Sequence, residues 1–166
     1  MSKAFTRESD VESEAPLRPL GPELPPGVPN YMTPEGAARL REEHDRWLHA
    51  DRARLAGDAA ALRDRGPRLA FLARRLEALE IVPPAPPGTE QVLFGATVTV
   101  RDSRDEERRY RIVGVDEADP PRGLLGFRSP IAVALLGARR GEVVVVRSPR
   151  GDEELEIVDV RYDTST

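Results

Sequence analysis

Cysteine and histidine, which commonly serve as nucleophiles, general bases and zinc ligands, are scarce in this sequence. There is no cysteine, which excludes disulfides, thiolate metal sites and cysteine nucleophiles. His44 and His49 lie on one predicted helix with no third ligand nearby, so we expect no metal site. Asp58 follows Gly57 at a predicted turn between two helical stretches. A carboxylate at this position can cap the second helix.

The overall composition restricts the function classes. The 166 residues are 39% hydrophobic and 33% charged, which is typical of a folded chain with a modest core. The net charge of −4 argues against non-specific DNA binding, which normally requires a basic excess. No apolar run of about 18 residues occurs, and the N-terminus lacks the apolar core of a signal peptide. We therefore expect a cytoplasmic protein that does not contact a membrane.

Residues 31–82 have the features of two antiparallel helices. Thr33 is a good N-cap, and Pro34 suits the first helical position. Leucines then recur at the spacing of a short coiled coil, at Leu62, Leu69, Leu72, Leu76 and Leu79. Gly66-Pro67 interrupts this pattern, so the second helix is either kinked there or begins again at Pro67. The prediction is a helical hairpin, a short antiparallel coiled coil, whose tip is at Gly57-Asp58.

The other segments flank this hairpin. Residues 1–30 are polar and proline-rich, which predicts a disordered or loosely ordered tail. Residues 83–90 are rich in proline and are interpreted as a linker. Residues 91–163 change to an alternating pattern, which predicts strands at 92–100, 109–115, 141–146 and 154–160 and a short helix at 130–136. We therefore predict an α+β fold, in which the hairpin precedes a small, mostly antiparallel sheet with one helix packed on it.

Four motifs resemble the Gre family of transcript-cleavage factors. Met32-Thr33-Pro34-Glu35-Gly36 is similar to the start of that family's N-terminal hairpin, and residues 94–98 are similar to its first C-terminal strand. Residues 112–119 resemble its second strand and following turn. Residues 129–137 resemble its C-terminal helix, although the family usually has arginine at the position of Val133. The motifs occur in the family's order.

The resemblance implies a coiled coil followed by a C-terminal domain with an FKBP-like fold. Such proteins bind bacterial RNA polymerase beside its secondary channel, chiefly through the C-terminal domain, and meet nucleic acid only indirectly through the elongation complex. Acidic residues at the coiled-coil tip help to hold a catalytic magnesium, a cation that prefers oxygen ligands. The resemblance also places Ser129, Pro130, Ile131 and Ala132 in the polymerase-docking surface. A helix N-cap and a first-turn proline explain Ser129 and Pro130 equally well without a partner.

The predicted tip departs from the family pattern. The family has glycine–aspartate, two further residues, then glutamate and asparagine, whereas here Gly57-Asp58 is followed by Ala61 and Leu62 at the last two positions. One of the two carboxylates is missing, and Asp64 lies too far along the chain to replace it. Each arm is also shorter by roughly nine residues, which at about 1.5 Å per residue removes about 14 Å of reach. Catalytic placement tolerates errors on the order of 1 Å, so the tip should fall short of the polymerase active site.

We therefore expect a monomeric polymerase-binding regulator without cleavage activity, similar to the Rnk-type relatives with a shortened coiled coil. No catalytic residue, metal or cofactor is expected. One alternative is an active cleavage factor that uses Asp58. Another is an FKBP-like peptidyl-prolyl isomerase, although fold alone does not confer that activity and the domain is poor in aromatic residues. A general interaction module without a polymerase partner is the remaining alternative.

Overall fold

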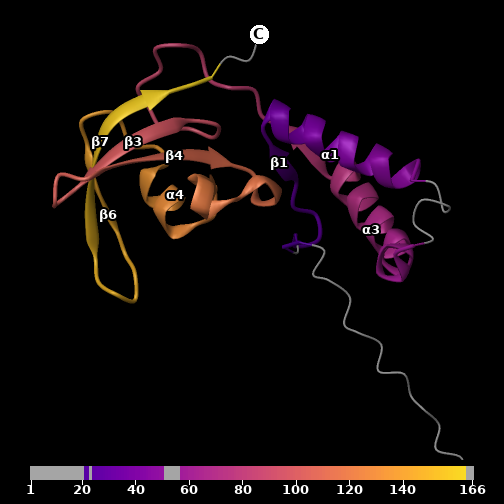
Figure 1. The fold of residues 1–166 in the computed structure, drawn as a ribbon. Helices are drawn as coiled ribbons and strands as arrows, with labels where there is room; N and C mark the ends of the chain where they lie inside the picture. Colours follow the sequence, from indigo (N-terminus) through magenta and orange to yellow (C-terminus); the bar gives the residue numbers. More distant parts are fainter. Residues whose placement is uncertain (1–20, 23, 51–56, 164–166) are drawn as a thin grey trace, which may run out of the picture.

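The computed structural model describes residues 21–22, 24–50 and 57–163. These residues form a pair of helices with a two-stranded sheet, followed by a five-stranded sheet that carries one short helix (Figure 1). The mixed helix and sheet content confirms the predicted α+β class. The FKBP-like assignment stays a prediction. Among the described residues, no helix is both long enough and apolar enough to cross a membrane.

The two helices are α1 (Pro34–Leu48) and α3 (Ala59–Glu77). Thr33 caps α1 by accepting a hydrogen bond from the Gly36 amide, as the sequence predicts. The helices run in opposite directions, because the end of α1 at Leu48 lies against Arg65 and the earlier Glu43 lies against Arg68. Their connection at residues 51–56 lies outside the described residues.

Helix α3 passes through Gly66-Pro67 without a break, so the interpretation in which the helix begins again at Pro67 is wrong. The leucine pattern is buried only at the base of the pair. Leu72 is 1% exposed, whereas Leu62 near the tip is 37% exposed. The buried cluster there consists of Met32, Ala37, Leu40 and Leu72, with Trp47, Phe71, Leu76 and Leu79 packed against it.

The base of the helix pair is closed by two strands that the sequence does not indicate. Strand β1 (Asn30–Met32) pairs in parallel with β2 (Leu79–Ile81), which follows α3 directly. Asn30 is fully buried, so the segment predicted as tail already forms structure at its last residue. Each strand has only three residues, too few to show an alternating pattern, and each depends on a partner far away in the chain.

Five strands form the C-terminal sheet in the order β5-β4-β3-β7-β6. They are β3 (Thr97–Asp102), β4 (Glu107–Val113), β5 (Leu124–Gly126), β6 (Val143–Val146) and β7 (Glu153–Arg161). All neighbours are antiparallel except β4 and β5. The three-residue β5 was not predicted. The first strand begins at Thr97 rather than at residue 92, because Gly95 has φ +84° in a turn closed by the Ala96 amide and the Leu93 carbonyl.

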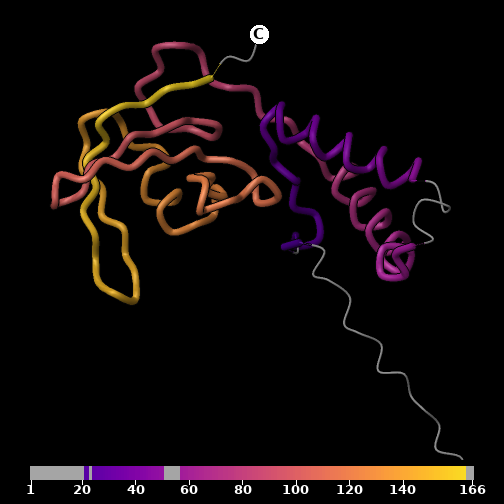
Figure 2. Tube along the Cα trace, in the orientation of Figure 1, coloured from indigo at the N-terminus to yellow at the C-terminus, as the bar shows by residue number. Residues whose placement is uncertain are grey.

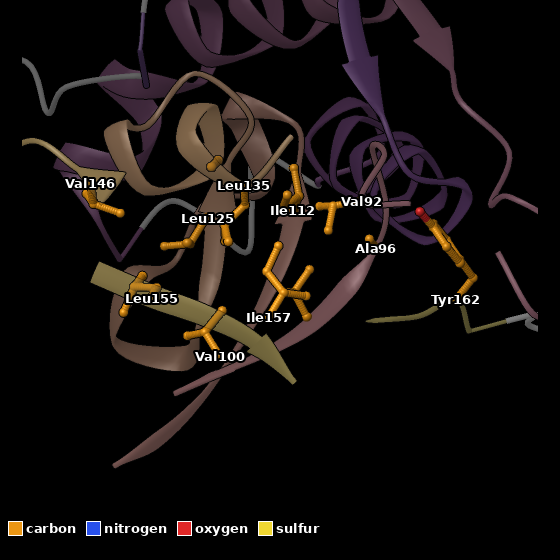
Figure 3. Close-up of a cluster of buried hydrophobic side chains, with 12 residues drawn as sticks. Val92, Ala96, Val100, Ile112, Leu125, Leu135, Val146, Leu155, Ile157 and Tyr162 are labelled. Carbon is orange, nitrogen blue, oxygen red and sulfur yellow. The ribbon is translucent and has the colours of Figure 1, made fainter. Parts of the chain in front are cut away.

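Helix α4 (Pro130–Leu135) lies over one face of this sheet (Figure 2). Its Leu135 enters a buried aliphatic cluster with Ile112, Leu125, Leu155 and Ile157 (Figure 3). Full burial of each such side chain contributes about 1.5–3 kcal/mol, so this cluster stabilises the domain. The sheet thereby holds α4 in a fixed place.

Candidate functional site

The start of α4 presents part of its predicted docking motif to solvent. Ser129 caps the helix, since its hydroxyl accepts a hydrogen bond from the Ala132 amide at 3.3 Å. Pro130 is exposed and Ile131 is half-buried against the core. Ala132 is fully buried, so its methyl group offers no surface to a partner. Only Ser129, Pro130 and Ile131 therefore remain as surface candidates.

The outward side of α4 is apolar. Val133 is three residues after Pro130, which places both on the same side of the helix, and its side chain is 60% exposed. Ala132 and Leu135 lie on the opposite side, in the core. The short helix thus presents a small apolar surface on a rigid support.

The predicted tip carries one acidic residue in a structural position. Asp58 is the N-cap of α3, and its carboxylate accepts a hydrogen bond from the Ala61 amide at 3.0 Å. Ala61 itself is helical and provides no carboxylate. Within the described part of the chain, no three His, Cys, Asp or Glu side chains come together as metal ligands.

A buried carboxylate joins the helix pair to the C-terminal sheet. Glu117 lies in the 3₁₀ turn η1 (Val115–Glu117), directly after β4. It accepts hydrogen bonds from the Thr33 amide at 2.9 Å and from the Thr33 hydroxyl at 2.5 Å. The Gly114 amide donates to the same carboxylate at 3.0 Å, and the Arg39 guanidinium lies 3.7 Å from it. Glu117 therefore holds the residue that caps α1.

The neighbouring carboxylate holds the other helix. Asp116 accepts a hydrogen bond from the Asn30 amide group at 2.9 Å and forms an ion pair with Arg75 of α3 at 3.3 Å. Arg75 is only 4% exposed, and its guanidinium also lies 4.8 Å from the centre of the Phe71 ring. A buried arginine requires such partners, because an unpaired buried charge is costly.

Close contacts at two glycines complete this junction. A Cβ at Gly36 would lie 2.0 Å from the Glu117 carboxylate, and one at Gly114 would lie 2.1 Å from the Tyr31 carbonyl oxygen. A side chain at Gly114 would collide with backbone, whereas one at Gly36 would displace the Glu117 side chain. Beside them, the Tyr31 ring meets Phe127 edge-on at 6.0 Å, and Phe127 meets Phe94 at 5.9 Å.

Sequence reasoning missed this junction. The sequence pattern assigns residues 114 and 115 to the end of a strand and residues 116 and 117 to the turn after it, although two acidic residues there follow an apolar strand and a glycine. This pair of acidic residues was the available sequence signal for a polar contact at the end of the strand. It does not reveal the partners, because Thr33 and Glu117 are 84 positions apart.

Comparison with known proteins agrees with the motifs. The family model described as transcription elongation factor GreA/GreB, C-terminal, matches residues 87–162. The transcription elongation factor GreB of Pseudomonas aeruginosa is 39% identical over 156 positions, covering 82% of this chain and 92% of the relative. GreA of Halorhodospira halophila is 37% identical over 153 positions, covering 80% of this chain and 97% of that relative. A solved GreA/GreB structure from Nitrosomonas europaea is 26% identical, with a TM-score of 0.41, and covers 80% of this chain and 98% of that one.

Both sequence alignments also contain positions that this chain lacks. For the Pseudomonas relative, 82% of 166 residues is about 136, so about 20 of the 156 aligned positions have no counterpart here. For the Halorhodospira relative, 80% of this chain is about 133 residues, so about 20 of the 153 alignment positions again have no counterpart in this chain. With this identity over most of both lengths, the chain belongs to the GreA/GreB family of transcription elongation factors.

Proposed function

We propose that this protein binds bacterial RNA polymerase at the secondary channel and does not stimulate transcript cleavage. It acts in the cytoplasm as a monomer, docks through an FKBP-like C-terminal domain and presents a shortened helical hairpin, as in Rnk-type relatives. Family membership supports the polymerase as partner, because the similar proteins are transcription elongation factors.

The tip is the observation that carries the loss of cleavage activity. Asp58 is occupied as a helix cap, and Ala61 stands where the family's second carboxylate is expected. The helices are short, since α1 has 15 residues and is therefore about 22 Å long. The roughly 20 aligned positions missing from this chain agree in number with two arms that each lack about nine residues.

The surface of α4 supports docking through the C-terminal domain. Pro130 and Val133 form an exposed apolar side on a helix that the core holds rigidly. Only a minority of interface residues, fewer than about 30%, contribute more than about 1 kcal/mol, and these lie near the centre of the interface. Docking needs no carboxylate at the tip, so this protein can bind the polymerase without stimulating transcript cleavage.

Two of the three alternatives have less support from the structure. A cleavage factor that uses Asp58 needs a different partner carboxylate for a magnesium site, since Ala61 stands at the expected position. A peptidyl-prolyl isomerase needs an apolar pocket for proline. The sheet face under α4 is instead filled by its own side chains, including Ile112, Leu135 and Ile157, each 0% exposed.

A cleavage assay on a backtracked elongation complex tests the proposal. The protein alone should leave the transcript intact, and it should suppress cleavage by an authentic GreA or GreB in a parallel reaction. Transcript shortening by this protein alone would refute the loss of cleavage activity. No effect in either reaction would refute occupation of the channel.

A pair of matched substitutions tests the docking surface. Val133→Asp should weaken binding to core polymerase by about tenfold, which corresponds to about 1.4 kcal/mol. Val145→Asp on β6 is the control, because Val145 is also exposed, at 48%, but lies outside α4. Equal losses in the two variants, measured by fluorescence anisotropy, would mean that α4 is not the docking surface.

A further inference from the structure

The covalent connection alone does not fix the orientation of the helix pair relative to the five-stranded sheet. The backbone passes from one part to the other once, through residues 82–90, which form neither helix nor strand. Linked parts of a chain move relative to each other unless their interface prevents it. Side chains at the junction must therefore determine the direction in which the helices point.

Two adjacent residues are placed to do this. Successive residues of a 3₁₀ turn point about 120° apart, because the turn has about three residues per turn. Glu117 reaches the start of α1 through Thr33, whereas Asp116 reaches the end of α3 through Arg75 and β1 through Asn30. We propose that Asp116 and Glu117 are positioning residues that fix the direction of the helix pair relative to the C-terminal sheet.

The contacts of Glu117 are those of a rigid joint rather than a surface ion pair. Its side chain is only 2% exposed, and both oxygens accept hydrogen bonds. Two of the donors are backbone amides, Thr33 on the helix side and Gly114 on the sheet side, so one carboxylate connects the two backbones directly. Hydrogen bonds to a buried charged group are stronger and more directional than solvated ones.

The second set of contacts makes the joint resist rotation. A single carboxylate would act as a pivot, but Asp116 binds α3 at a separate point and the Tyr31–Phe127 contact adds a third. At Gly114 the two parts are in backbone contact, beside the Tyr31 carbonyl, and at Gly36 the Glu117 side chain packs directly on the helix. The short helix pair therefore stands in one direction before any partner binds.

Distance measurement in the free protein tests this inference independently of polymerase binding. Since the chain has no cysteine, Ala70→Cys on α3 and Ser103→Cys in the β3–β4 turn give two unique, exposed sites for spin labels. The parent protein should show one narrow distance distribution by double electron–electron resonance. Glu117→Ala should shift and broaden it, whereas Glu117→Gln should largely restore it, since an amide can still accept the backbone hydrogen bonds.

Glu107→Ala is the matched control, because Glu107 is also paired with arginine, Arg101, but lies away from the junction. An unchanged distribution in Glu117→Ala, or equal broadening in Glu107→Ala, would overturn the inference. If Glu117→Ala fails to fold, Thr33→Val and Thr33→Ser replace it, with helix content checked by circular dichroism. The valine variant, which lacks the hydroxyl, should broaden the distribution and the serine variant should not; identical distributions would overturn the inference.

Discussion

Asp102, at the end of β3, is a buried carboxylate on which stability should depend in acid. The hydrogen bond from Arg108, at 2.8 Å, and backbone donors from Glu106 and Arg104 lower its pKa. Because the pKa is lower in the folded state, ionised Asp102 stabilises the fold above about pH 4 and this contribution disappears as the pH falls through the folded pKa. Asp102→Asn should therefore be less stable at neutral pH, with the difference narrowing in acid.

Urea unfolding between neutral pH and acid measures this effect. Asp105→Asn is the control, because Asp105 pairs with Arg101 but its side chain is 87% exposed. Exposed pairs contribute little, so this variant should follow the parent protein. A pH-independent difference between Asp102→Asn and the parent would contradict the assignment.

Tyr162 ties the end of β7 to the segment before β3. Its hydroxyl donates to the Gln91 carbonyl at 2.5 Å and accepts from the Leu93 amide at 2.9 Å. Tyr162→Phe leaves both backbone groups without this partner, so the free energy of unfolding should fall by about 1–2 kcal/mol. Tyr110→Phe, whose hydroxyl has a contact of 3.5 Å with Arg108, should have a smaller effect in the same denaturation assay. Equal losses would mean that the Tyr162 contacts are not specific.

At the scale of elements, local signals predicted the helices better than the strands. Caps identify α1 and α4, because Thr33 and Ser129 satisfy amides within their own first turns. The three-residue strands β1, β2 and β5 were missed, because their stability comes from partners distant in sequence rather than from their own pattern. Turn geometry explains why the first C-terminal strand begins later than predicted, since Gly95 delays the start of β3.

The interior of α3 contains two residues that weaken it. A Cβ at Gly66 would meet no atom within 4 Å, so Gly66→Ala should raise the free energy of unfolding by about 1 kcal/mol. Pro67→Ala should add about 1 kcal/mol by restoring an amide donor to the helix. Circular dichroism and denaturant unfolding measure both effects. Ala70→Gly, on the exposed side of the same helix, should lower stability by about 1 kcal/mol. A lower free energy of unfolding in Gly66→Ala and Pro67→Ala would mean that Gly66 and Pro67 are needed for the packing of α3.

For the whole molecule, the separate parts of the candidate site were more predictable than their arrangement. Asp58 and Ser129 occupy the local positions that their neighbours indicate, each as a helix cap. The burial of Ala132 and the junction at Glu117 depend on how the helices meet the sheet, which no local pattern contains. The direction of the tip is therefore a property of the folded chain, whereas the chemistry available at the tip can be read from the sequence.

The proposed loss of cleavage has two separable causes, a missing carboxylate and missing length. Ala61→Glu supplies the carboxylate but leaves the tip about 14 Å short, so it should not stimulate cleavage. Lengthening both arms by about nine residues, about 14 Å, supplies reach without the second metal ligand and should also fail. Only the lengthened chain that also carries Ala61→Glu should shorten a backtracked transcript, because it alone combines reach with paired oxygen ligands.

Each variant in this set has a defined meaning in the same assay. Cleavage by Ala61→Glu alone would show that the short arms reach the active site and that chemistry is the only deficit. Cleavage by the lengthened chain alone would show that Asp58, despite its role as a cap, is sufficient as the protein's metal ligand. Because the junction at Asp116 and Glu117 is unchanged in all three, differences among them report the tip and not the direction of the helices.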